Sequence, residues 1–174
     1  MAFTDELAKS LDDLDQEVGA ETDAGRSLES VLDRYLREIE GAADSDIRTS
    51  ILLLDRDRKH LLHGAAPSLP KAYCEAIDGI AVGPSVGSCG TAAYAGHSIF
   101  VTDIATDPLW TDFRDLALSH DLRSCWSTPI RSSNEEVVGT FAIYHSTARA
   151  PTEHEIFAVK DISGHVAHAI ARWR

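Results

Sequence analysis

Residues 83–130 read GPSVGSCGTAAYAGHSIFVTDIATDPLWTDFRDLALSHDLRSCWSTPI. Glycines and a proline crowd the first eight positions, a composition typical of a loop. The run SIFVTD (98–103) predicts a strand, and 122–130 predicts another. Between them, Asp107 and Pro108 predict the start of a helical stretch, because Asp accepts from free backbone amides and Pro already has a helical φ. The stretch therefore predicts strands of a sheet separated by an inserted loop and helix.

The flanking sequence predicts the rest of this sheet. The apolar run 49–55 (TSILLLD) indicates a strand covered on both faces, and 60–65 follows a polar turn as its antiparallel partner. Ser68 as N-cap, followed by Pro70, predicts a helix over 71–77. The strand 137–145 follows 122–130 after the turn Ser132-Ser133-Asn134.

Helices are predicted at both ends of the chain. A capping box of Thr152 and Glu155 predicts the start of the last one, and a second helix covers 28–39 and stops near Gly41. The apolar stripe of the first helix is Phe3, Leu7, Leu11, Leu14 and Val18, and that of the last is Ile156, Val159, Val166, Ile170 and Trp173. Two helices, a mostly antiparallel sheet with helical insertions and a final helix make an α+β fold.

The length and composition indicate one domain and exclude several functions. The chain has 174 residues and a net charge of −12, and residues 1–46 hold 14 acidic but only 4 basic side chains. This charge repels phosphate backbones, which argues against nucleic-acid binding. No apolar run is long enough to span a membrane, and the N-terminus lacks the features of a secretory signal. Three cysteines form no disulfide framework, so we expect a cytoplasmic protein.

Three strings in this sequence together resemble the GAF domains of bacterial sensor kinases and cyclic-dinucleotide enzymes. They are GSCGTA (87–92), DIATDPLW (103–110) and CWSTPI (125–130), and the resemblance extends through GTFAIY (139–144). It covers about residues 25–174 and leaves 1–24 as an N-terminal helix and linker. It implies a central antiparallel sheet of about six strands, with the first and last helices on one face. The other face is expected to carry a ligand pocket roofed by the loop and helix insertions.

The resemblance implies a sensory module in signal transduction, in which a small molecule binds under 107–120 and the terminal helices relay the event. An aromatic on an inserted loop next to a sheet can form the apolar lid of a pocket. A histidine kinase or another signalling effector is the expected partner. The predicted ligand-binding residues are Trp110, Phe113, Leu116, Cys125, Ser127 and Cys89.

The same resemblance bears on thiol chemistry and on cofactor binding. Cys89 is placed at a helix start, where a thiol pKa can fall, so a thiol-based redox sensor or reductase is an alternative. In free-methionine-(R)-sulfoxide reductases the catalytic cysteine occupies the position of Leu118, so we expect no such activity. Asp112 and Phe113 stand where bilin-binding relatives attach chromophore, which argues against covalent bilin. Haem, with His97 or His120 beside the pocket, and a small metabolite remain open.

A homodimer is predicted from the terminal helices. The stripe of the first helix has the 4-3-4 spacing of a coiled-coil seam, and the helix 28–39 already supplies apolar surface for that face of the sheet. The first stripe is therefore expected to be spare, and an exposed apolar stripe marks an interface. A ligand-free dimerisation module is the second alternative to ligand sensing.

Overall fold

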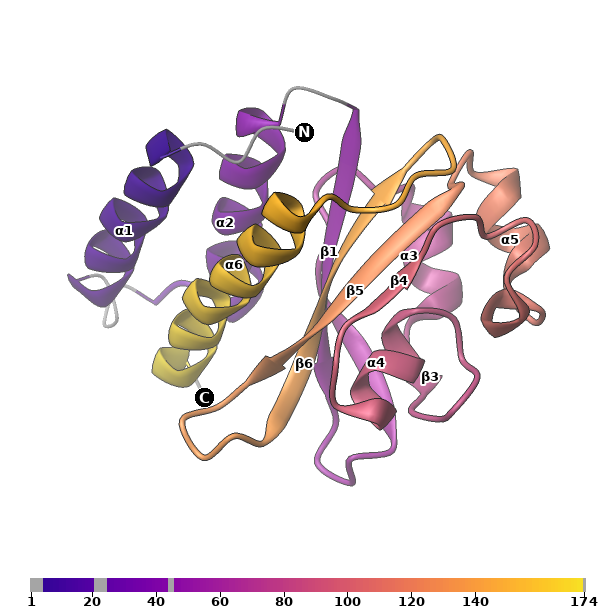
Figure 1. The fold of residues 1–174 in the computed structure, drawn as a ribbon. Coiled ribbons are helices and arrows are strands. Elements are labelled where there is room, and N and C mark those ends of the chain that lie inside the picture. The colour runs from indigo at the N-terminus through magenta and orange to yellow at the C-terminus, as the bar shows by residue number, and fades with distance from the viewer. Residues whose placement is uncertain (1–4, 21–24, 44–45, 174) are drawn as a thin grey trace.

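The computed structural model describes residues 5–20, 25–43 and 46–173. Six antiparallel strands form one sheet in the order β3-β2-β1-β6-β5-β4 (Figure 1). The strands are β1 (Ile47–Leu54), β2 (His60–Ala65), β3 (Ile80–Ala81), β4 (Ile99–Val101), β5 (Ser124–Arg131) and β6 (Val137–His145). The helices are α1 (Asp5–Ala20), α2 (Leu28–Ala42), α3 (Lys71–Ile77), α4 (Cys89–Ala95), the 3-10 helix η1 (Pro108–Trp110), α5 (Arg114–Ser119) and α6 (Glu153–Trp173). The predicted α+β fold with a six-stranded antiparallel sheet is confirmed. None of the helices in the described ranges is long and apolar enough to cross a bilayer.

Helices cover both faces of the sheet. α2 and α6 lie directly on one face with α1 outside them, and α3, α4 and α5 lie on the other (Figure 1). Two separate hydrophobic cores follow, one under the terminal helices and one under the inserted helices. The terminal helices thus share one face, as the resemblance implied.

Side chains of the central strands alternate between these two cores. In β5, Trp126 belongs to the core under the terminal helices, whereas Cys125 belongs to the core under the inserted helices. In β6, Phe141 belongs to the core under the terminal helices and Tyr144 to the core under the inserted helices. A strand covered on both faces has no polar side, which explains why β1 ends in the continuous apolar run of residues 51–54 (ILLL).

Two predicted helix starts are confirmed because their signals are satisfied locally. At α6, Thr152 Oγ1 accepts from the Glu155 backbone N–H at 3.2 Å, and Glu155 Oε1 accepts from the Thr152 backbone N–H at 3.0 Å. At η1, Asp107 Oδ1 accepts from the Leu109 backbone N–H at 2.9 Å. Each of these bonds satisfies a backbone donor that a helix start leaves free.

Three local predictions are wrong. Ser68 does not cap α3; Pro70 occupies the N-cap position without a side-chain bond, and the Ser68 hydroxyl donates to the Glu40 carboxylate instead. The strand expected over 98–103 spans only Ile99–Val101, since Asp103 accepts from the Ala105 backbone N–H and turns the chain. Ile156 is 41% exposed, because the buried face of α6 follows Glu155, Val159, Ile162, Val166 and Ile170.

The apolar stripe of α1 is covered by its own chain. Leu7, Leu11, Leu14 and Val18 are buried, because α1 packs against both α2 and α6. The expectation of a spare stripe is therefore wrong: α2 and α6 contact each other, and the stripe of α1 packs against both and belongs to the same hydrophobic core. Phe3, the first residue of the predicted stripe, lies outside the described residues.

Candidate functional site

A small cavity lies between the sheet and the inserted helices. Its volume is about 20 Å³, which is room for one water molecule. β1 and β6 form its floor through Leu52 and Tyr144, and Trp110 and Phe113 of the η1–α5 segment form its roof. The other lining residues are Tyr73, Ile77, Ile80, Val86, Gly87, Ser88 and Cys89.

A chain of buried hydrogen bonds ties the roof of this cavity to β5 of the sheet. Trp110 Nε1 donates to Ser88 Oγ at 3.0 Å, and Ser88 Oγ donates to the backbone carbonyl of Cys125 at 3.0 Å. Beside them, the Gly87 backbone N–H donates to the Leu109 carbonyl at 2.8 Å. Gly87 has a φ of +58°, a left-handed conformation that suits glycine. The position of Trp110 is therefore set by the loop that precedes α4.

Two tyrosines meet in the wall of the cavity. The hydroxyl oxygens of Tyr73 and Tyr144 are 3.0 Å apart, and the two rings pack edge to face with centroids 5.7 Å apart. Burial raises the pKa of both hydroxyls well above its ordinary value. Both tyrosines therefore stay neutral and act as hydrogen-bonding groups, not as bases.

Two buried thiols lie at the cavity: Cys89 lines it, and Cys125 of β5 is adjacent to Cys89. The pKa of Cys89 is lowered chiefly by the adjacent Cys125 thiol, with further contributions from the hydroxyls of Ser127, Thr140 and Tyr144. Burial raises the pKa of Cys125 well above its ordinary value. Cys89 is only 4% exposed, so a reagent in solution reaches this sulfur only if the roof opens.

The sheet floor under α4 carries hydroxyls that lack partners. Ser127 Oγ and Thr140 Oγ1 are buried and lie near the Cys89 sulfur, but neither oxygen forms a hydrogen bond among the described residues. They share a sheet face, because Ser127 lies two residues from Cys125 on β5, and Thr140 lies two residues from Ala142 on β6. An unpartnered buried hydroxyl is unfavourable unless water or a ligand satisfies it. The Ser127 and Thr140 hydroxyls can therefore form hydrogen bonds with water or with a polar group of a ligand.

A family model of the GAF domain matches residues 25–171. The chain belongs to the GAF domain family. The methyl sulfide methyltransferase-associated sensor of Methanosarcina acetivorans is 41% identical to this GAF domain over 133 residues, which are 76% of this chain and 13% of that sensor. The chain therefore spans only a small part of that relative.

Solved structures share the fold of this GAF domain. The GAF domain of a phosphoenolpyruvate-protein phosphotransferase from Coxiella burnetii aligns with a TM-score of 0.69 and 18% identity, covering 94% of each chain. The reduced form of fRMsr from Staphylococcus aureus aligns with a TM-score of 0.65 and 15% identity, covering 94% of this chain and 95% of that one. At these identities the likeness concerns the fold alone.

The six predicted ligand-binding residues are distributed unequally around the cavity of the GAF domain. Trp110, Phe113 and Cys89 line it. Cys125 and Ser127 lie on the same sheet face without lining the cavity, and half-buried Leu116 packs at the edge of the same core.

The two histidines considered beside the pocket lie in different places. The ring of His120 packs edge to face on Tyr73 at 5.9 Å, so this histidine neighbours a cavity-lining side chain. His97 is exposed and lines a groove beside Ile156 and Lys160 of α6. The expectation that His97 flanks the pocket is wrong, because the turn at Gly96 carries the chain toward α6.

Sequence reasoning missed Tyr73, Ser88, Thr140 and Tyr144. The two residues of β6 could have been found, because strand alternation places every second residue of 137–145 on the face of Cys125 once the β5–β6 register is known. No comparable signal marked Tyr73 or Ser88, which reach the cavity only through the packing of α3 and the loop before α4.

Proposed function

We propose that this GAF domain is the ligand-sensing part of a signalling protein and binds a small molecule between the sheet and the 107–120 segment. The 41% identical relative is a sensor. The observation that carries the proposal is the cavity under the aromatic roof of Trp110 and Phe113, together with the buried hydroxyls of Ser127 and Thr140, which lie on the same sheet face without lining the cavity. An apolar pocket with a few convergent polar groups is the usual design of a small-molecule site.

Binding requires the roof to open. Small-molecule sites usually have volumes of about 300–1,000 Å³, far above the 20 Å³ of this cavity. A hydrogen bond joins the two residues that flank the roof segment in the chain: Arg123 Nε donates to Asp103 Oδ1 at 2.8 Å. Within it, Arg114 donates to the carbonyls of Ile104 and Asp107. Opening must break the Trp110–Ser88 bond and the neighbouring bond from the Gly87 N–H to the Leu109 carbonyl, and the Ser88 hydroxyl can then accept a hydrogen bond from the ligand.

The relay to α6 runs through the opposite face of β5. Trp126 Nε1 donates to the Arg149 carbonyl at 2.9 Å, and the Arg149 guanidinium lies 5.1 Å from the Trp126 ring centroid. Arg149 also makes two hydrogen bonds, of 2.8 and 3.0 Å, to Glu155 in the first turn of α6. A ligand that shifts β5 therefore acts on the start of α6. It does so only to the extent that it binds the shifted state more tightly.

We expect sensing without catalysis, in the cytoplasm. Leu118 stands where the reductases carry their catalytic cysteine, and its side chain packs at the edge of the core under the inserted helices. The other candidate nucleophile, Cys89, is buried. The three cysteines of the described ranges are free thiols, which suits a reducing compartment.

The second candidate function is a ligand-free dimerisation module. The small cavity volume favours it, and so do two exposed apolar side chains on α6, Phe157 (76% exposed) and Ile156 (41% exposed). Since the α1 stripe is covered, we place the proposed homodimer contact on this outer face of α6. The same helix would then pass a signal to a histidine kinase or another effector.

Native mass spectrometry of the purified chain tests the first function. We expect a mass above 18.9 kDa that denaturation returns to the chain mass. Ser127→Ala should lose this bound species. Ser124→Ala is the matched control, because Ser124 is also a buried, unpartnered hydroxyl of β5 but lies on the other sheet face. A chain that carries no small molecule and dimerises through Phe157 supports the second function instead.

An absorbance spectrum identifies the class of ligand. The closed cavity is too small for a porphyrin, so we assign no cofactor. A Soret band that His120→Ala loses and His97→Ala keeps would identify haem. A bound mass without visible absorption would identify a colourless metabolite.

A further inference from the structure

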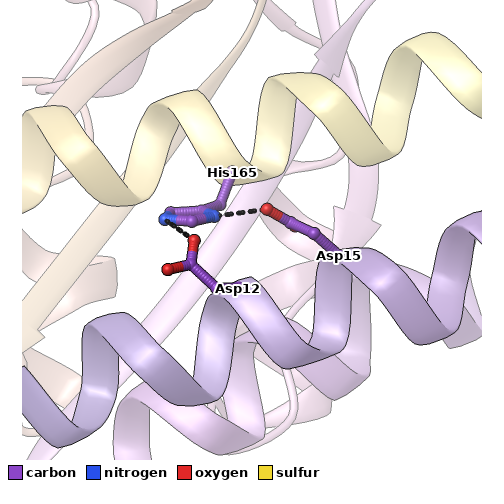
Figure 2. A group of neighbouring side chains, drawn as sticks. All are labelled: Asp12, Asp15 and His165. Atoms are coloured by element: carbon purple, nitrogen blue, oxygen red, sulfur yellow. Dashed lines mark hydrogen bonds and ion pairs between the residues drawn. The ribbon is translucent and has the colours of Figure 1, made fainter.

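A second group of chemically active side chains lies between α1 and α6, on the sheet face opposite the cavity. Figure 2 shows Asp12 and Asp15 of α1 facing His165 of α6. One ligand atom from each of these three residues lies within 4.8 Å of the others. Asp161, one turn before His165 on α6, adds a carboxylate 3.7 Å from His165 Nε2. The His165 side chain is mostly buried, at 13% exposed.

Asp15 determines which nitrogen of His165 carries hydrogen. Its Oδ2 lies 2.6 Å from His165 Nδ1, and its Oδ1 accepts from the Tyr35 hydroxyl at 2.7 Å. A carboxylate only accepts hydrogen bonds, so the hydrogen must be on Nδ1. In the neutral imidazole, Nε2 then presents a lone pair. A histidine held in this way by a second carboxylate is the common arrangement of a metal ligand.

The free nitrogen points at two carboxylates that it does not contact directly. Nε2 is 3.9 Å from Asp12 Oδ1 and 3.7 Å from Asp161 Oδ2. A charge-assisted hydrogen bond would be about 2.7–2.9 Å long, so neither carboxylate makes one with Nε2. Ligand atoms about 2.0–2.2 Å from one tetrahedral metal ion lie about 3.4 Å apart. The separations from Nε2, 3.9 Å to Asp12 and 3.7 Å to Asp161, are slightly longer than this, so an ion bound to Nε2 is within reach of each carboxylate after a small side-chain movement.

We propose that His165 Nε2, Asp12 and Asp161 bind one divalent zinc ion, with water as the fourth ligand and Asp15 orienting the histidine. Imidazole and carboxylate are ordinary zinc ligands, and the two ligating carboxylates balance the charge of the ion. Asp12 comes from α1, whereas Asp161 and His165 come from α6. The ion thus links the N-terminal helix to the C-terminal helix, and zinc controls how firmly α1 is docked. This site is independent of the cavity and of its ligand.

The test uses zinc chloride and the metal-stripped full chain in isothermal titration calorimetry. We expect one equivalent of zinc to bind the wild type, and the affinity to fall at least tenfold in Asp12→Asn and in His165→Gln. Asp12 is 69% exposed, so its variant is expected to keep the fold, which circular dichroism checks. Asp15→Asn should weaken binding by about 10–100-fold, the usual effect of losing an orienting carboxylate.

Two matched controls separate coordination from general charge. Asp13→Asn removes one charge from an exposed position of α1, and His168→Gln removes the other histidine of the last α6 turns; both should bind zinc like the wild type. Cobalt substitution should give the visible absorption of a tetrahedral site. The proposal is overturned if the wild type takes up no zinc, or if Asp12→Asn and His165→Gln bind it as the wild type does. Absence of zinc binding together with a doubly protonated His165 would assign the group to a simple ion pair.

Discussion

The ion pair of Arg149 and Glu155 is the contact that anchors the start of α6, and its removal gives the sharpest prediction. Arg149→Met keeps an aliphatic stem over Trp126 while it removes the charge. Glu155 is only 1% exposed and Arg149 is 29% exposed, so the substitution leaves a carboxylate buried beside no cation partner. Breaking a buried pair in this way costs about 3–5 kcal/mol, and the partial exposure of Arg149 places the expected loss near the lower end, about 3 kcal/mol.

The loss should depend on pH with a definite sign. Burial alone would raise the Glu155 pKa, but the bonds from Arg149 and Thr152 outweigh it and hold this pKa below its ordinary value. In the wild type this contribution to stability is complete above the ordinary carboxyl pKa and is lost as the pH falls through the lowered folded pKa. In Arg149→Met only the Thr152 bonds oppose the effect of burial, so the Glu155 pKa rises, the carboxylate takes up its proton at higher pH, and the cost of the unpaired charge falls with it.

His145, a buried histidine beside Arg149, also makes the stability difference between the wild type and Arg149→Met smaller at low pH. The His145 pKa is lowered to about 4, first by burial and then by the Arg149 charge. The folded wild type therefore resists protonation of His145, and it loses stability as the pH falls below the ordinary histidine pKa. Without the Arg149 charge the His145 pKa rises, so the variant loses less stability than the wild type as the pH falls. The stability gap between wild type and variant should narrow steadily from pH 7 to pH 4.

Urea denaturation at several pH values, followed by circular dichroism, measures this gap. Thermal denaturation at neutral pH should give a Tm about 6–12 °C below that of the wild type, since the Tm of a chain of this size shifts by about 2–4 °C per kcal/mol. Glu155→Gln keeps the capping bond without the charge, and the double variant with Arg149→Met should recover part of the loss. Arg37→Met removes an exposed pair with Asp33 and should change Tm little. A gap that is below 1 kcal/mol, or that does not change with pH, would refute the reasoning.

Three further substitutions test the packing. Leu11→Ala should cost about 2–5 kcal/mol in urea denaturation, because Leu11 is 1% exposed on the face of α1 that packs against α2 and α6; a loss below 1 kcal/mol would mean that α1 is not docked. Gly139→Ala should destabilise the sheet by at least about 1–3 kcal/mol, since its Cβ would lie 2.3 Å from the Leu52 carbonyl oxygen, and a neutral result contradicts this close approach. Trp110→Phe should cost about 1 kcal/mol through the lost bond to Ser88, with an unchanged midpoint as the contrary outcome.

The local signals of the sequence predicted elements where the chain satisfies them within a few residues. The capping box of Thr152 and Glu155 and the Asp107 cap are such cases, because donor and acceptor are close along the chain. Ser68 carried an equally good local signal and failed. Its hydroxyl found the Glu40 carboxylate, which is 28 residues away and which no local rule could bring near.

The candidate site was predictable to the extent that its residues follow strand alternation or the GAF motifs. Trp110 and Cys89 were placed in this way, and both line the cavity. Tyr73 comes from a separate helix, and its hydroxyl meets that of Tyr144 across 71 residues. Such a pair depends on how α3 docks on the sheet, which periodicity does not reveal.

By itself, the sequence determined the α+β class, the strand pairs near in the chain and the apolar face of most helices, because these depend on period and on local hydrogen bonds. Only the tertiary structure decided what each face covers. Leu7 and Leu11 form an apolar stripe whether it meets α2 and α6 or a second chain, since burial has no direction and any apolar partner satisfies it. The partner depends on the space that the other elements leave, and that space exists only in the folded chain.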